Sequence, residues 1–293
     1  MTQLDVRLYA AFAAAPFGGN IGAVVYEDEP LSAEVRQNIA AELAAPTTGF
    51  VAPDGNGSFH VHFHSSRCEM DMCGHVVVAI WSAMLKDGRI SPGEYDLHTK
   101  AGTIPVEVGR DGTIWMSQPL PRYDLNEVRL EEIAPLLGLQ TNAISNVSSS
   151  STALRHLFVE VSDVNALAAL CPKDEALRML STSNGIDTIG VWCWQGNEAG
   201  KAKIRLRDLC HGVGDPEEAA SGTTNAALAC HLYRSGRIKA DSRGELCMMG
   251  EQGFEMGRPS KVETILNEDD RGLTRVRVGG KAQERMHGRY LIA

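Results

Sequence analysis

Apolar and polar positions along the chain change in short, regular patterns that predict many strands and few helices. Alternating or continuous apolar runs predict strands at 5–12, 22–26, 48–53, 58–64, 94–100, 104–109, 113–118, 157–161, 188–194 and 203–208. Helical spacing of apolar residues predicts helices at 33–45, 126–137, 164–170 and 175–180. The serine-rich stretch 148–151 is predicted to be a loop. The mixture of elements predicts an α/β protein.

Two further predicted helices have almost no polar face. In the first, at 76–85, every residue except Ser82 is apolar or small, so this helix must lie inside the protein. Cys73 stands at its buried start. The second helix begins after Ser221, a good N-cap residue, and contains the largely apolar run 226–232. Because the two starts lie about half the chain apart, they indicate a duplicated unit.

The start of a buried helix is a place where chemistry is expected. Its first backbone N–H groups lack partners within the helix and carry a partial positive charge. Both features favour a thiolate at Cys73 or a bound carboxylate group. In the turn at 14–20, Asn20 adds a side-chain amide.

Charge and cysteine usage narrow the class of protein. The net charge of −9, with no compensating basic run, argues against nucleic acid or an anionic membrane surface as the main partner. No stretch approaches the ~18 uninterrupted apolar residues of a membrane helix. The short apolar run near the N-terminus is interrupted by Arg7 and is interpreted as a strand rather than a signal peptide. Seven scattered cysteines without CxxC spacing suggest neither disulfides nor a zinc ribbon, so a cytoplasmic protein is expected.

The segment FHVHFH at 59–64 places three histidines on one face of a strand. A metal site is disfavoured there, because no nearby carboxylate or cysteine completes a ligand set. The apolar residues between the histidines are the better candidates for the core, so the histidine face is predicted to be solvated or to face another domain. No metal-binding residue is therefore predicted.

The proline-rich segment 119–124 predicts a domain boundary. We expect a first half at 1–118, joined by the last strand at 284–293, and a second half at 119–283.

Five motifs, in order along nearly the whole chain, resemble the PhzF-like family of phenazine-biosynthesis isomerases. They are APFGGN, CGH at 73–75, GDPEEAASGTTNAALA at 214–229, EQGFEMGRPS at 251–260 and VRVGGKAQ at 276–283. The family belongs to the diaminopimelate epimerase and proline racemase superfamily. The resemblance implies two pseudo-symmetric halves, each a curved mixed β-sheet around a central helix. It also implies an active site in the cleft where the two helix starts meet, working without a cofactor or metal.

The chain departs from the family at informative positions. Phenazine isomerases use a glutamate where this chain has Pro46 or Thr47, and they have alanine where it has Cys73. In the latter respect the chain resembles the racemases, whose first catalytic cysteine begins a similar motif. Their second cysteine aligns with Ser221, which predicts a site with one thiol. A serine hydroxyl needs activation before it can act as a comparable base.

The resemblance also assigns the candidate residues. The family's aspartate aligns with Glu218, or with Glu217 or Asp215 if the loop is shifted. The predicted catalytic residues are Cys73, Glu218 and His75. The predicted substrate-binding residues are Asn20, Thr47, Gly74, Ser221, Gly222 and Thr223. His75 could instead hydrogen-bond the neighbouring loop, and Ser221 could be only an N-cap.

The resulting hypothesis is a cofactor-independent isomerase that moves a proton and a double bond in a small unsaturated carboxylic or amino acid. A pyrroline-type or proline-type acid from secondary-metabolite or antibiotic biosynthesis is favoured, and a homodimer is expected. An amino-acid racemase or epimerase and a 3-hydroxyproline dehydratase remain alternatives. A non-catalytic binding protein on the same fold is another alternative.

Overall fold

The computed structural model describes residues 2–55, 57–123, 128–241 and 244–292. It divides into two compact units. Unit 1 consists of Met1–Ser117 with Gly279–Ala293, and unit 2 is Gln118–Val278.

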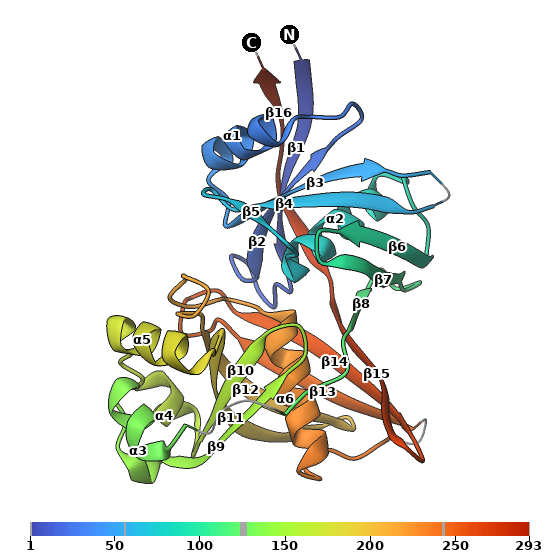
Figure 1. The fold of residues 1–293 in the computed structure, drawn as a ribbon. Helices are drawn as coiled ribbons and strands as arrows, with labels where there is room; N and C mark the ends of the chain where they lie inside the picture. Colours follow the sequence, from blue (N-terminus) through green and yellow to red (C-terminus); the bar gives the residue numbers. More distant parts are fainter. Residues whose placement is uncertain (1, 56, 124–127, 242–243, 293) are drawn as a thin grey trace. The chain divides into compact units, whose positions relative to one another are not determined.

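Unit 1 is a mixed sheet with helices on its two faces (Figure 1). Its strand order is β16 (Ala282–Ile292), β1 (Thr2–Ala11), β2 (Asn20–Tyr26), β3 (Thr47–Pro53), β4 (Phe59–His64), β6 (Gly93–Thr99), β7 (Gly102–Val108) and β8 (Ile114–Gln118). The short β5 (Glu69–Met70) pairs with β4. Helix α2 (Gly74–Lys86) packs against β1, β2, β3 and β16, and α1 (Ala33–Leu43) packs against β3 and β4.

Unit 2 has the same construction, with more helices outside its sheet (Figure 1). Its strand order is β15 (Gly272–Gly280), β14 (Ser260–Asp269), β13 (Glu245–Gln252), β12 (Lys201–Leu209), β11 (Thr188–Glu198), β10 (Arg155–Val161) and β9 (Ile144–Ser151). Helix α6 (Gly222–Arg234) contacts β9, β10, β13 and β14, so the sheet curves around it. The other helices are α3 (Leu130–Ile133), α4 (Val164–Ala168), α5 (Asp174–Asn184) and the 3₁₀ turns Ala134–Leu136 and Thr141–Ala143.

The order of strand pairing repeats between the units. In unit 1, β1–β2 and β3–β4 are antiparallel, whereas β2–β3 and β4–β6 are parallel. In unit 2, β9–β10 and β11–β12 are antiparallel, whereas β10–β11 and β12–β13 are parallel. Each parallel pair is joined by a helical crossover, and α2 and α6 occupy the second crossover of their units. The predicted fold of two halves, each a curved sheet around a central helix, is confirmed.

The sheet of unit 1 lies unusually close to α2. Gly22 of β2 and Gly49 of β3 both face this helix. A Cβ atom at Gly22 would lie 2.9 Å from Val76, and one at Gly49 would lie 2.6 Å from Val76 and 2.7 Å from Ile80. These glycines let the backbone of both strands approach the helix, so α2 is fixed closely against the sheet.

The opposite face of these strands is covered by α1, which corrects the prediction for the histidine strand. His64 is only 2% exposed, and its Nδ1 lies 2.9 Å from Oε1 of Gln37 on α1. Phe50 packs edge-on against the same ring. The prediction of a solvated histidine face is therefore wrong at His64, although His60 is exposed. The polar face of β4 is buried where α1 supplies a hydrogen-bond partner.

The serine-rich stretch at 148–151 is part of strand β9, so the prediction of a loop there is wrong. Ser150 is fully buried, and its hydroxyl donates to the carbonyl of Ala227 on α6 at 2.7 Å. Oγ of Ser148 lies 3.2 Å from Nε2 of His231 on the same helix. Serine can occupy a buried strand here because the neighbouring helix satisfies its hydroxyl groups.

The helix predicted at 126–137 is much shorter in the structure. Its predicted start falls in 124–127, outside the described residues, and α3 covers only Leu130–Ile133 before a 3₁₀ turn. Pro135 lies in that turn and cannot donate a helical hydrogen bond. The continuous helix predicted there is therefore wrong.

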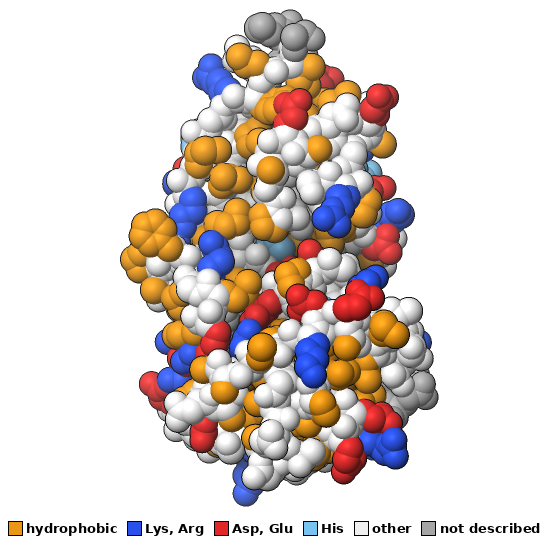
Figure 2. Space-filling model, turned by 90° about the vertical axis from the view of Figure 1, so that its left-hand side faces the viewer, with side chains coloured by type: hydrophobic (Ala, Val, Ile, Leu, Met, Phe, Trp, Pro, Cys, Tyr) orange, Lys and Arg blue, Asp and Glu red, His pale blue; other side chains and the backbone are white. Residues whose placement is uncertain are grey.

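Across the described residues, no helix has both the length and the apolar composition needed to cross a membrane. On the face drawn in Figure 2, Lys and Arg side chains are dispersed among acidic ones rather than gathered into a basic patch.

Candidate active site

Cys73 is the N-cap residue of α2. Its backbone is extended, and its side chain makes no capping hydrogen bond. The side chain is buried, and Sγ lies 3.4 Å from Nδ1 of His75. The thiol therefore lies at the positive end of a helix dipole, with an imidazole within hydrogen-bond distance.

His75 is a buried, neutral imidazole. Burial lowers its pKa to about 4, and a backbone hydrogen bond with Ile21 opposes this shift. Nδ2 of Asn20 lies 3.2 Å from Nδ1 of His75. Because an amide Nδ2 can only donate, Nδ1 is the accepting nitrogen of the ring, and the other nitrogen carries the proton. At neutral pH, His75 can orient or hydrogen-bond the Cys73 thiol, but it supplies no positive charge.

Asn20 and Thr47 lie on the face of the sheet that carries α2. Asn20 is two residues before Gly22 on β2, so both share that face. Thr47 pairs with Gly22 in the parallel β2–β3 ladder. Both polar residues are buried, and the Thr47 hydroxyl donates to Sδ of Met70, a weak acceptor, at 3.7 Å. The structure thus brings Asn20, His75 and Cys73 together. Thr47 lies beside Gly22 on the same face of the sheet, and Gly74 begins α2.

The N-terminus of α6 is capped by the side chain of Ser221. Oγ of Ser221 accepts from the backbone N–H of Thr224 at 3.3 Å and lies 3.1 Å from Oγ1 of Thr223. The Ser221 N–H donates to Oε1 of Gln252 at 3.2 Å. Ser221 and Thr223 are partly exposed, whereas Gly222 is buried. These three predicted binding residues thus lie together in the first turn of the helix.

The three candidate carboxylates before α6 occupy different environments. Glu217 forms a two-point ion pair with Arg207, at 3.0 Å to Nε and 2.8 Å to Nη2. Asp215 is exposed. Glu218 is half-buried, and its backbone is fixed by Asp208 and Gln252, at 3.0 and 2.7 Å. Arg207 therefore holds the Glu217 carboxylate, whereas Glu218 is half-buried on the loop directly before α6.

The sequence analysis missed two residues behind Ser221. Asp208 and Thr224 are both fully buried, and the Thr224 hydroxyl donates to Oδ2 of Asp208 at 2.6 Å. Burial raises the pKa of Asp208 to about 6, although hydrogen bonds from Thr224 and Thr188 oppose the shift. A signal was present in the sequence, because Asp208 occupies an inward position in the alternating strand KAKIRLRDL.

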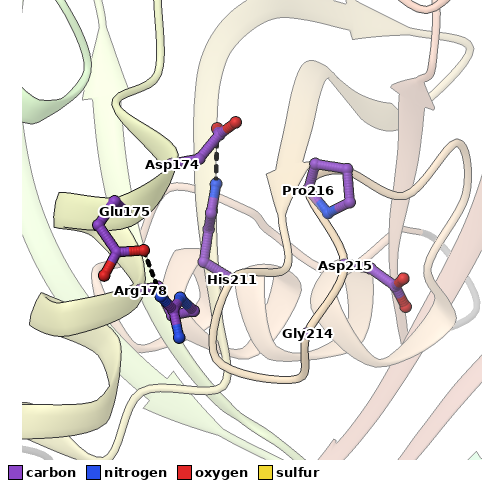
Figure 3. Close-up of a pocket in the computed structure, with 7 residues that line it drawn as sticks. All are labelled: Asp174, Glu175, Arg178, His211, Gly214, Asp215 and Pro216. Atoms are coloured by element: carbon purple, nitrogen blue, oxygen red, sulfur yellow. Dashed lines mark hydrogen bonds and ion pairs between the residues drawn. The ribbon is translucent and has the colours of Figure 1, made fainter.

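A separate pocket of about 310 Å³ opens beside α5 in unit 2. In Figure 3, His211 points toward Asp174, with Nε2 3.0 Å from Oδ1, and Glu175 pairs with Arg178. Gly214, Asp215 and Pro216 form the opposite wall. None of the nine residues predicted for the site lines this pocket, although Asp215, the alternative acid for a shifted loop, does.

Comparison with known proteins identifies relatives along nearly the whole chain. The family model described as phenazine biosynthesis-like protein matches residues 9–288. An uncharacterized isomerase of Deinococcus radiodurans is 28% identical, over 95% of this chain and 92% of the relative. The trans-2,3-dihydro-3-hydroxyanthranilate isomerase of Pseudomonas aeruginosa is 29% identical, over 96% and 97% of the two chains.

Solved structures agree in fold. A phenazine biosynthesis protein of the PhzF family from Bacillus anthracis superposes with a TM-score of 0.87 over 100% of both chains, at 24% identity. A hydroxyproline epimerase from Agrobacterium vitis superposes with a TM-score of 0.65 over 99% of this chain and 91% of its own, at 12% identity. The fold is therefore shared with both PhzF-type and epimerase-type proteins. Together with the match over 9–288, these relatives show that the chain belongs to the phenazine biosynthesis-like (PhzC-PhzF) family of isomerases.

Proposed function

We propose that this isomerase moves a proton, and with it a double bond, in a small unsaturated carboxylic or amino acid. A pyrroline-type or proline-type acid is the favoured substrate class. The observation that carries the proposal is Cys73, a buried thiol at an uncapped helix start beside a neutral imidazole. Such a thiol can exchange a proton with carbon once its thiolate is stabilised by the helix start.

The proposed roles follow from the local geometry. Cys73 removes or returns a proton, and His75 hydrogen-bonds the thiol or the substrate as a neutral group. Asn20 fixes the ring of His75, and Thr47 offers a hydroxyl beside it. Backbone N–H groups of Gly74 and His75 would stabilise the negative charge that develops when carbon loses a proton.

The start of α6 is proposed to contribute to the same reaction. N–H groups of Gly222 and Thr223 are suited to a carboxylate, because they begin a helix without an acidic residue in its first turn. Ser221 would contact the substrate, and Glu218 is the proposed second proton carrier. The two other carboxylates are less suited, since Glu217 is paired with Arg207 and Asp215 is exposed.

We extend the proposal to the setting of the enzyme. None of the seven cysteines is in a disulfide bond, which is in keeping with the reducing cytoplasm that we propose. Relatives named for an anthranilate-derived substrate support a role in secondary-metabolite or antibiotic biosynthesis. A homodimer is proposed from the family resemblance.

Solvent-deuterium exchange with a panel of acids tests the function. The panel contains pyrroline carboxylates, proline, 3-hydroxyproline and trans-2,3-dihydro-3-hydroxyanthranilate. We expect deuterium incorporation with migration of the double bond, followed by NMR. Exchange with inversion at the α-carbon would instead indicate a racemase or epimerase, and loss of water from 3-hydroxyproline would indicate a dehydratase. Absence of any exchange would favour a non-catalytic binding protein.

A further inference from the structure

A continuous chain of side-chain oxygens runs inward from the start of α6. Oγ of Ser221 lies 2.9 Å from Oγ1 of Thr224, and this hydroxyl lies 2.6 Å from Oδ2 of Asp208. Ser221 is partly exposed, whereas the other two residues are fully buried. The hydroxyl group of Thr224 thus connects the buried carboxyl group of Asp208 to Ser221, which is partly exposed.

The direction of these hydrogen bonds follows from the number of protons. Thr224 has one hydroxyl proton, which it donates to Asp208. It can therefore only accept from Ser221, so the Ser221 proton points toward Thr224. The Ser221 oxygen accepts from the Thr224 N–H with one lone pair. Its second lone pair takes the substrate proton when the Thr223 hydroxyl, 3.1 Å away on a partly exposed residue, turns aside. In this arrangement, a proton that leaves Ser221 moves inward toward Asp208.

We propose that Asp208 is the proton reservoir of Ser221, connected to it through the hydroxyl of Thr224. This inference rests on the proposed function and extends it, because it gives Ser221 the activation that a serine needs to exchange protons with carbon. Asp208 acts through Ser221 and Thr224 and is a positioning residue. The relay operates alongside Glu218, whose carboxylate lies on the loop before α6.

The proton balance of the relay is simple. When a C–H bond of the substrate breaks, its proton forms a new O–H bond at Ser221 and its electron pair stays on the substrate. The former Ser221 proton passes to Thr224, and the former Thr224 proton passes to Asp208, which changes from carboxylate to carboxylic acid. Return of a proton to another carbon reverses the three transfers. No oxidant, reductant or further reactant is required.

The surroundings of Asp208 suit an acid that gains and loses a proton near neutral pH. Burial raises its pKa to about 6, within reach of physiological pH. The titratable groups nearest to it are Cys210 on the same strand end, Glu218 and Asp215 on the loop before α6, and His156 beyond Thr188. Burial keeps the pKa of the Cys210 thiol raised and lowers the pKa of His156 to about 3, so both are neutral while Asp208 titrates.

Removing single members of the hydrogen-bonded series Ser221–Thr224–Asp208 tests the relay. In Asp208→Asn and in Thr224→Val, the rate of solvent-deuterium exchange should fall by at least ~100-fold, the lower end for loss of an acid–base group. Thr224→Ser keeps the hydroxyl and should restore most of the rate. Thr264→Val is the matched control: Thr264 is a buried threonine of unit 2 whose hydroxyl has no hydrogen-bond partner among the described residues.

A pH profile separates a relay from a purely structural contact. Proton removal needs ionised Asp208, so kcat in that direction should fall as the pH drops through about 6. That limb should disappear in Asp208→Asn while KM changes little. A structural role would lower activity at all pH values without removing the limb.

Carbon-13 NMR of the Asp208 carboxyl group gives a readout that needs no substrate. The Thr224 hydrogen bond favours the carboxylate, so Thr224→Val should raise the titration midpoint. Ser221→Ala should raise it by a smaller amount, because the Ser221 hydroxyl favours the carboxylate less than the Thr224 and Thr188 hydroxyls do, and Thr264→Val should leave it unchanged.

Failure of the relay can be told from failure of the proposed function. An active wild-type protein with full exchange in both Thr224→Val and Asp208→Asn overturns the relay and leaves the function standing. A wild-type protein that exchanges no proton in any acid overturns the function. The carboxyl titration then decides the relay: a midpoint insensitive to Thr224→Val overturns it, and the predicted shift supports it.

Discussion

The starts of α2 and α6 occupy equivalent places in the two units, but they differ in chemistry. Cys73 is the N-cap residue of α2 but makes no side-chain hydrogen bond to the helix start, and its sulfur lies beside the neutral ring of His75. Ser221 caps α6 with its hydroxyl and is connected through Thr224 to the buried carboxyl of Asp208. One start therefore carries a thiol, and the other carries a hydroxyl with an acid behind it.

The difference is explained by the acidity of the two side chains. A thiol has a reference pKa near 8.5, so a helix start can bring its thiolate into use without a further acid. A serine hydroxyl is far less acidic and needs a base to receive its proton. Unit 2 supplies such a base from strand β12, whereas the Cys73 sulfur lies within hydrogen-bond distance of the neutral imidazole of His75.

The largest effect is expected from removal of the thiol. Cys73→Ala should reduce double-bond migration by at least ~100-fold, because no other group at this start of α2 can carry the proton. The fold should persist, since the change removes one sulfur atom and no capping hydrogen bond. Turnover by deuterium exchange and thermal unfolding measure the two effects.

Cys171→Ala is the matched control, because Cys171 is an exposed free thiol of unit 2. It should leave exchange unchanged. Comparable exchange in Cys73→Ala and wild type would remove Cys73 from the proposed mechanism.

The next prediction places a thiol at the start of α6, so that both helix starts carry the same chemical group. In Ser221→Cys, the new thiol should no longer need Asp208 to receive its proton. Thr224→Val should therefore lower the exchange rate much less in this background than the ~100-fold expected in wild type. Exchange rates of the two single variants and the double variant form the required cycle. An equal loss in both backgrounds would show that Thr224 only supports the helix start.

A smaller effect, on stability rather than on activity, is expected from a methyl group added at Gly49, where the sheet approaches α2. Gly49→Ala should lower the free energy of unfolding by about 1–3 kcal/mol, the usual cost of overpacking, because its Cβ would lie 2.6 Å from Val76. Gly288→Ala on β16 is the control, since no atom lies within 4 Å of a Cβ there. Denaturant unfolding measures both. Equal stability of the two variants would mean that α2 can shift away from β3 at little cost.

Much of the fold was accessible from the sequence because its signals are local. Apolar residues on every side of 76–85 require a buried helix wherever the chain places it, and the helix predicted at 33–45 corresponds to α1. The strands of both units have apolar faces that show in their spacing. The prediction failed at 148–151 and at His64, where polar residues are buried against helices distant in sequence.

The sequence by itself determined the family motifs, the two buried helices and the residues at their starts. Only the tertiary structure decided that Asn20 lies against His75, that Arg207 holds Glu217, and that Asp208 lies behind Ser221. The physical reason is the cost of burying polar groups. An inward-facing acid such as Asp208 is tolerated only where partners such as Thr224 converge on it, and the packing of strand against helix decides which residues converge.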